Sequence, residues 1–188
     1  MAPGALRRVL REASGTPAIA VAAFGIFLWI QFSGPFITGD DPYYHIAVSQ
    51  VYSKQGIIKS FPWMQFAIQK EKFGDGHFLF HIAMIPFLWR DPIQGAKVYS
   101  VILAAIGVAV FASVLKSFRV PYLSLWVLLL FSSGPFFLYR FSVVRPQILA
   151  VTFALLSFWA VTKERPFPVG LVTFFYFLSY SSAHIALI

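Results

Sequence analysis

Residues 17–45, PAIAVAAFGIFLWIQFSGPFITGDDPYYH, place a long apolar run shortly before two acidic residues. The apolar part, residues 17–36, is longer than the apolar core of a signal peptide, and no small-residue cleavage site follows it. It therefore predicts a retained first membrane helix. Arg7, Arg8 and Arg11 precede the run, which favours a cytoplasmic N-terminus and places the acidic residues on the outer side.

The acidic stretch also carries the signals of a helix start. Pro42 favours the first helical turn and Asp41 is a good N-cap residue, so we expect a helix from Pro42 to about Lys54. His45 lies four residues after Asp41 and hence on the same helical face, where the two side chains can share a divalent cation or a substrate proton. The alternative is an ordinary N-cap followed by an interfacial histidine.

The motif DDPYYH at residues 40–45 resembles the first-loop acidic motif of oligosaccharyltransferase catalytic subunits, especially the archaeal and bacterial ones. These enzymes belong to the GT-C superfamily of membrane glycosyltransferases. The resemblance implies that Asp41 helps to hold a catalytic divalent metal, Mg²⁺ or Mn²⁺, at the outer membrane face. Asp40 matches the motif less specifically. The resemblance further implies a sugar donor linked to a polyprenyl phosphate.

Composition independently indicates an integral membrane protein. Hydrophobic residues make up 59% of the chain and charged residues 12%, and the mean hydropathy is +0.74. The chain has no cysteine, which excludes disulfides, thiolate metal sites and a cysteine nucleophile. The net charge of +8 does not indicate nucleic-acid binding, because basic residues at the ends of membrane helices anchor them to the headgroups of the lipid bilayer.

The order of apolar and polar segments predicts an all-α polytopic membrane protein of GT-C-like architecture, with about five transmembrane helices. A long first outer loop, 37–97, carries amphipathic and interfacial helices folded onto the membrane surface. Its apolar part, 77–89, is too short to cross and is expected to be interfacial or re-entrant. The chain thus reads as a single transmembrane domain, 1–188, with a cytoplasmic N-terminus at 1–15 and four further helices in 98–188: 98–115, 120–139, 147–162 and 167–188.

A second candidate cluster lies late in the outer loop. His77 and His81 are one helical turn apart and follow Asp75 closely. The spacing is compatible with zinc, with a contact to phosphate or substrate, or with interfacial packing. Many GT-C enzymes carry a histidine-containing segment at the end of the first outer loop, facing the lipid-linked donor. The resemblance therefore favours substrate-phosphate binding, with His77 as the better match.

Two arginines, Arg140 and Arg145, bracket the predicted second outer loop. Guanidinium groups at a membrane surface suit a polyprenyl phosphate or diphosphate, and the alternative is ordinary anchoring to lipid headgroups. Residues 140–146 contain no Asp or Glu, whereas the second outer loop of oligosaccharyltransferases supplies further acidic metal ligands. A metal-independent relative in which Asp41 acts as a general base is therefore a second interpretation.

The leading hypothesis is a membrane glycosyltransferase that moves a sugar or oligosaccharide from a polyprenyl-phosphate-linked donor to a protein, lipid or glycan acceptor at the outer face of the plasma membrane. Asp41, Asp40 and His45 are the catalytic candidates, and the donor phosphate is assigned to His77, His81, Arg140 and Arg145. The alternatives are a non-catalytic truncated GT-C relative or membrane assembly factor, and a transporter subunit. The chain ends in apolar sequence, from which we expect the N-terminal part of a longer protein.

Overall fold

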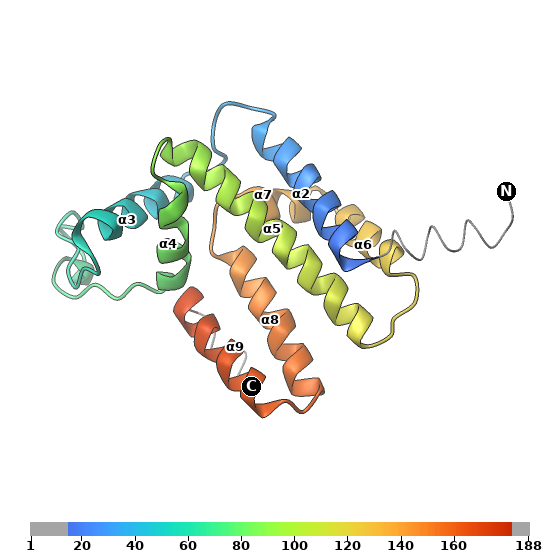
Figure 1. The fold of residues 1–188 in the computed structure, drawn as a ribbon. Helices are drawn as coiled ribbons and strands as arrows, with labels where there is room; N and C mark the ends of the chain where they lie inside the picture. The colour runs from blue at the N-terminus through green and yellow to red at the C-terminus, as the bar shows by residue number, and fades with distance from the viewer. Residues whose placement is uncertain (1–14, 182–188) are drawn as a thin grey trace, which may run out of the picture.

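The computed structural model describes residues 15–181, and every regular element in that part of the chain is helical, which confirms the predicted all-α class (Figure 1). The predicted cytoplasmic segment up to residue 14, and residues 182–188 of the last predicted span, lie outside the described residues. The elements are, in chain order, α2 (Thr16–Phe32), α3 (Asp41–Gln55), η1 (Ile68–Lys70), α4 (Phe78–Met84), η2 (Ile85–Phe87), α5 (Pro92–Ser117), α6 (Leu123–Ser132), α7 (Pro135–Ser142), α8 (Gln147–Thr162) and α9 (Pro166–Ser179).

Helix α5 lies at the centre and the other helices pack around it (Figure 1). Its start is well defined, because Asp91 Oδ1 accepts hydrogen bonds from the backbone N–H groups of Ile93 and Gln94 at 2.9 and 3.1 Å. A Cβ atom at Gly95 would lie 1.8 Å from the carbonyl oxygen of Phe87, so only glycine fits where η2 turns into α5. The helix begins before the predicted Val98, which makes Lys97 a buried helical residue.

Among the described helices, α5 alone is long and apolar enough to cross a membrane as an unbroken helix. Helices α6 and α7 pass the same test only as a pair, and they meet at an angle of 89°. The predicted single span 120–139 is therefore wrong as one straight helix. Gly134 adopts a φ of 132° and Pro135 lacks a backbone N–H, so the helix ends before this pair and restarts in a new direction.

Three further helices are apolar, namely α2, α8 and α9, with 17, 16 and 14 residues. Helices α2 and α8 pack on α5, whereas α9 packs on α8 and α4. Gln31, at the end of α2, donates to Ser100 Oγ at 2.5 Å, near the start of α5, so α2 and α5 run in opposite directions. Helix α8 runs parallel to α5, since Lys163 just beyond its end donates to the carbonyl of Ser117 at 3.1 Å. Helix α9 then returns, and its last residues reach the loop that precedes α4.

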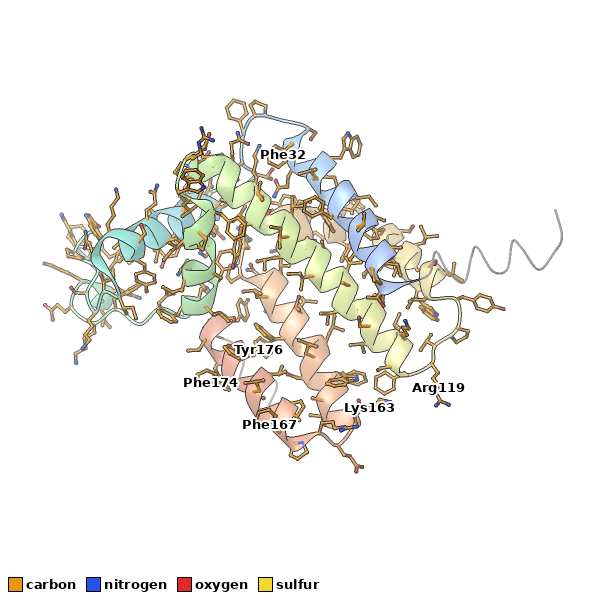
Figure 2. The ribbon with its side chains drawn as sticks, in the orientation of Figure 1. Phe32, Arg119, Lys163, Phe167, Phe174 and Tyr176 are labelled. Carbon is orange, nitrogen blue, oxygen red and sulfur yellow. The ribbon has the colours of Figure 1, made fainter. Side chains whose placement is uncertain are left out.

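Three labelled side chains mark the two ends of the bundle. Phe32 lies at one end, whereas Arg119 and Lys163 lie at the other (Figure 2). Helices α3 and α4 pack beside the first turns of α5 (Figure 1). The predicted helix from Pro42 to about Lys54 corresponds to α3, and the short apolar segment 77–89 forms α4 and η2, which stay below the length of a membrane span.

Candidate functional site

The start of α3 is set by the residues that precede it. Gly39 has a φ of 89°, a conformation that favours glycine, and it turns the chain from α2 into α3. Asp40 is the N-cap residue and Asp41 is the first helical residue, and neither side chain caps the helix. The predicted N-cap role of Asp41 is therefore wrong. The physical reason is that the helix starts one residue earlier, which leaves the Asp41 carboxylate free to meet a residue from another part of the chain.

That residue is Arg145, which lies between α7 and α8. Its Nη2 is 2.5 Å from Asp41 Oδ2. The Asp41 side chain is 53% exposed and the Arg145 side chain 22%, and Arg145 Nε is buried without a hydrogen-bond partner among the described residues. Ion pairs this open to water contribute roughly 0.2–1 kcal/mol to stability. The pair is therefore a weak structural link but an accessible combination of a carboxylate and a hydrogen-bond donor.

One turn further along α3, His45 enters a buried chain of hydrogen bonds. Its Nδ1 lies 2.8 Å from His81 Nε2, and His81 Nδ1 lies 2.7 Å from Asp75 Oδ2. The same Asp75 oxygen accepts from the Tyr52 hydroxyl at 2.8 Å, and its other oxygen accepts from the backbone N–H of His77 at 2.9 Å. His81 is fully buried and His45 is 4% exposed. Asp75 is thus the terminal acceptor of the whole chain.

The partners fix the protons on both rings. A carboxylate only accepts, so His81 donates from Nδ1 to Asp75. When His81 is neutral its Nε2 is an acceptor, so His45 donates from Nδ1 and keeps a lone pair on its own Nε2. The order Asp75–His81–His45 therefore presents a neutral imidazole base on the face of α3 that also carries Asp41.

Burial and neighbouring charges reinforce this arrangement. Burial, followed by the charge of His81, lowers the pKa of His45 to about 3, and Arg145 is close enough to lower that pKa as well. Burial alone would raise the pKa of Asp75, but hydrogen bonds from His81, His77 and Tyr52 outweigh it and lower the pKa below its usual range. The carboxylate is therefore held in its charged form and His45 in its neutral form.

Two tyrosines and the third histidine complete the surroundings. Burial raises the pKa of Tyr44, as does the charge of Asp75, and burial together with the hydrogen bond to Asp75 raises the pKa of Tyr52. Burial lowers the pKa of His77. These phenols stay protonated and His77 is favoured in its neutral form, so Asp75 supplies the negative charge inside the cluster.

His77 connects the cluster to the last described helix. Its Nδ1–H donates to the carbonyl oxygen of Ser179 at 3.3 Å, and its ring stacks on Tyr180 with 5.5 Å between ring centres. A Cβ atom at Gly76 would lie 3.1 Å from Cβ of Ser181. The loop before α4 is therefore packed directly against the end of α9.

Several predicted site residues come together, but others do not. The structure gathers His45, His77 and His81 in one cluster and pairs Asp41 with Arg145. Arg140 instead lies exposed on α7, with its guanidinium 4.8 Å from the centre of the Phe136 ring. Asp40 is exposed and makes no side-chain cap. No hydrogen bond or ion pair among the described residues joins Arg140 to the Asp41–Arg145 pair.

A metal at Asp41 does not fit the residues that the structure describes. No group of three or more His, Asp or Glu residues in 15–181 is arranged to hold a metal ion. The guanidinium of Arg145 already occupies Asp41 Oδ2, and both ring nitrogens of His81 are engaged by Asp75 and His45. The zinc interpretation of His77, His81 and Asp75 fails for the same reason, since His81 has no free nitrogen to coordinate.

Sequence reasoning missed the central role of Asp75 and the contributions of Tyr52 and Ser179. The sequence pattern indicated Asp75 only as a possible zinc ligand. The available signal was local: Asp75 stands between two glycines, two residues before His77 and six before His81. The contributions of Tyr52 and Ser179 depend on how α3 and α9 pack, and no short sequence pattern indicates them.

Comparison with protein-family models, with curated proteins and with solved structures finds no match for this chain.

Proposed function

We propose that this chain is a membrane glycosyltransferase of the GT-C type, which transfers a sugar or oligosaccharide from a polyprenyl-phosphate-linked donor to an acceptor. The observation that carries the proposal is the Asp41–Arg145 pair. It combines an accessible carboxylate, able to take a proton, with a partly exposed guanidinium, able to donate hydrogen bonds to a phosphate. Such a pair provides the two functions that sugar transfer from a phosphate requires.

The reaction assigns one task to each member of the pair. A nucleophilic O–H or N–H of the acceptor attacks the anomeric carbon of the donor sugar, and the bond from that carbon to the phosphate oxygen breaks. The proton of the nucleophile passes to the Asp41 carboxylate. The phosphate leaves with the bonding electrons, and the Arg145 guanidinium stabilises its growing negative charge. The DDPYYH resemblance supports the same site, since the acidic residue of that motif, Asp41 here, belongs to the catalytic site of the enzymes that the motif resembles.

The arrangement of the helices supports a multi-pass protein with its site at the outer face. The directions of α2, α5, α8 and α9 alternate as about five crossings require, if the bent α6–α7 pair counts as one. Large apolar side chains point outward from several of these helices, as lipid-facing positions do, including Trp29, Leu128, Phe158 and Phe174. Arg119 and Lys163 lie at the end opposite the site, which favours that end as the cytoplasmic one.

The proposal is tested with Asp41→Asn in membranes that contain the complete protein. Asparagine keeps the shape of the side chain but removes its charge, so transfer from a polyprenyl-linked sugar donor is expected to fall at least about 100-fold at unchanged expression. Asp40→Asn is the matched control, because it alters the neighbouring carboxylate, which makes no side-chain cap.

Near-normal transfer by Asp41→Asn would remove Asp41 from the mechanism. Equal losses in Asp41→Asn and Asp40→Asn would point to a general effect of negative charge at the start of α3. A wild-type protein that transfers no sugar from any polyprenyl-linked donor would instead favour the non-catalytic relative or membrane assembly factor.

A further inference from the structure

We propose that Asp75, His81 and His45 form a proton relay that takes the proton received by Asp41 and holds it on His81, beside the Asp75 carboxylate. The inference rests on the proposed function, because sugar transfer supplies the proton. It adds a role for three residues that the Asp41–Arg145 pair does not explain. His45 is the entry point of the relay, His81 is the residue that stores the proton, and Asp75 is a positioning residue.

The geometry provides an unbroken path from α3 to the loop before α4. The two links are 2.8 and 2.7 Å long, which is the range of good hydrogen bonds. Fully buried His81 and nearly buried His45 exchange little with water, so a proton that enters at His45 stays in the chain. A fully satisfied network of this kind is also expected to be rigid.

The proton balance is simple. In the resting chain His45 carries its proton on Nδ1, and His81 carries its proton on the Nδ1 that faces Asp75. A proton from Asp41 binds the lone pair of His45 Nε2, and the His45 Nδ1 proton moves to His81 Nε2. His45 is again neutral, with its proton now on Nε2, and His81 has become an imidazolium paired with Asp75. Reversal of these steps releases the proton.

The charges around the cluster favour a single stored proton on His81. Asp75 provides the negative charge and contacts His81 directly. His45 is approached from other elements by Arg145 and by the ring of His77, whose centre lies 5.8 Å away, and from its own helix by the ring of Tyr44, whose centre lies 5.3 Å away. Tyr52 donates to Asp75 from α3, and Tyr180 stacks on His77 from beyond α9. A second proton on His45 would meet the positive charges of His81 and Arg145 without a carboxylate of its own.

The relay begins next to the proposed reaction centre. His45 lies one helical turn after Asp41, on the same face of α3, where side chains four residues apart are neighbours. Arg145, which binds Asp41, also influences the charge of His45. In this relay a water molecule or the acceptor itself would carry the proton from the Asp41 carboxyl to His45 Nε2.

The first test locates the protons without any reaction. The full chain, labelled with ¹⁵N-histidine in detergent micelles, is measured by NMR at about pH 8, above the ordinary histidine pKa of about 6.5. We expect His45 to carry its proton on Nδ1, the less common form of a free imidazole. In Asp75→Asn the amide N–H₂ replaces the acceptor oxygen facing His81, so the proton of His45 should move to Nε2. Asp91→Asn, at the exposed cap of α5, is the control and should leave the form of His45 unchanged.

A wild-type His45 with its proton on Nε2, or the same form of His45 in wild type and Asp75→Asn, would overturn the relay. If Asp75→Asn does not fold, Asp75→Glu provides the second variant, because it keeps the carboxylate and should keep the wild-type form. These spectra test the proton positions in the relay whether or not the protein transfers sugar.

The second test measures catalysis. We expect Asp75→Asn to lower kcat about 100-fold with little change in KM for the donor, the scale of a lost acid–base function, and Asp75→Glu to recover part of the loss. A merely structural role predicts no change in kcat once the folded fraction is equal. If the wild-type protein gives the expected spectra but transfers no sugar, the proposed function is wrong and the assigned proton positions still hold.

Discussion

Helix α3 carries two polar clusters one turn apart, and they differ in burial. The Asp41–Arg145 pair is open to solvent, with a carboxylate that is 53% exposed. The Asp75–His81–His45 chain is closed, and the side chain of Asp75 is only 5% exposed. The same helix therefore presents one carboxylate that a substrate can reach and one imidazole whose state is set by buried neighbours.

The exposure of each cluster determines how strongly its loss should affect the stability of the protein. An exposed ion pair contributes little to stability, so its loss should affect chemistry first. A buried hydrogen-bonded chain is expensive to interrupt, because each member left without a partner stays desolvated. Substitutions in the exposed pair should consequently lower transfer with little loss of stability, whereas substitutions in the buried chain should also lower the free energy of unfolding.

The largest expected effect comes from breaking the exposed pair. Arg145→Ala removes the proposed phosphate contact and should lower transfer from a polyprenyl-linked donor by about 100-fold or more, the usual effect of losing one charge-stabilising donor. The unfolding midpoint should change little. Arg140→Ala is the matched control, since Arg140 lies on Phe136 and away from Asp41. Equal losses of transfer in both variants would show that the site recognises general positive charge and not the Asp41–Arg145 pair.

The next effect comes from interrupting the buried chain. Asp75→Ala leaves His81 Nδ1 and the Tyr52 hydroxyl without their acceptor, which should lower the free energy of unfolding by about 1–3 kcal/mol. Asp41→Ala should cost less than about 1 kcal/mol, because its pair is exposed. Denaturant titration of both variants in the same detergent measures the difference. A smaller loss for Asp75→Ala than for Asp41→Ala would reverse the assignment of the two clusters.

Acid should weaken the buried chain progressively. Burial lowers the pKa of His45 to about 3 and also lowers the pKa of His77. Near pH 6.5 the unfolded chain therefore binds protons at these histidines that the folded chain does not bind. Stability is therefore full above about pH 6.5 and falls below it, by up to about 1.4 kcal/mol per pH unit for an imidazole as shifted as His45. Thermal unfolding between about pH 8 and pH 5 measures this slope.

His45→Gln provides the control for the acid effect, because glutamine cannot take up a proton. The slope should become shallower in this variant. An unfolding midpoint that does not change with pH in the wild-type protein, or a slope that His45→Gln leaves intact, would show that the histidines do not carry the acid sensitivity.

The sequence by itself determined the all-α fold class and the segment in which the candidate site begins. Apolar runs of helical length predicted an all-α protein, and the GDDPYYH stretch marked the start of α3 to within one residue. These features are local, because helix starts depend on Gly39, Pro42 and residues beside them. The spacing of His77 and His81 was likewise visible, although their partners were not.

Only the tertiary structure decided which of these residues meet. Arg145 pairs with Asp41 and Arg140 does not, a difference that two arginines in one short loop cannot reveal. Asp75 became the centre of the buried chain because α3 and α4 pack within hydrogen-bond distance of it. The physical reason is range: hydrophobic pattern and turn chemistry act over a few neighbouring residues, whereas a hydrogen bond of about 3 Å between distant segments exists only once the helices are packed.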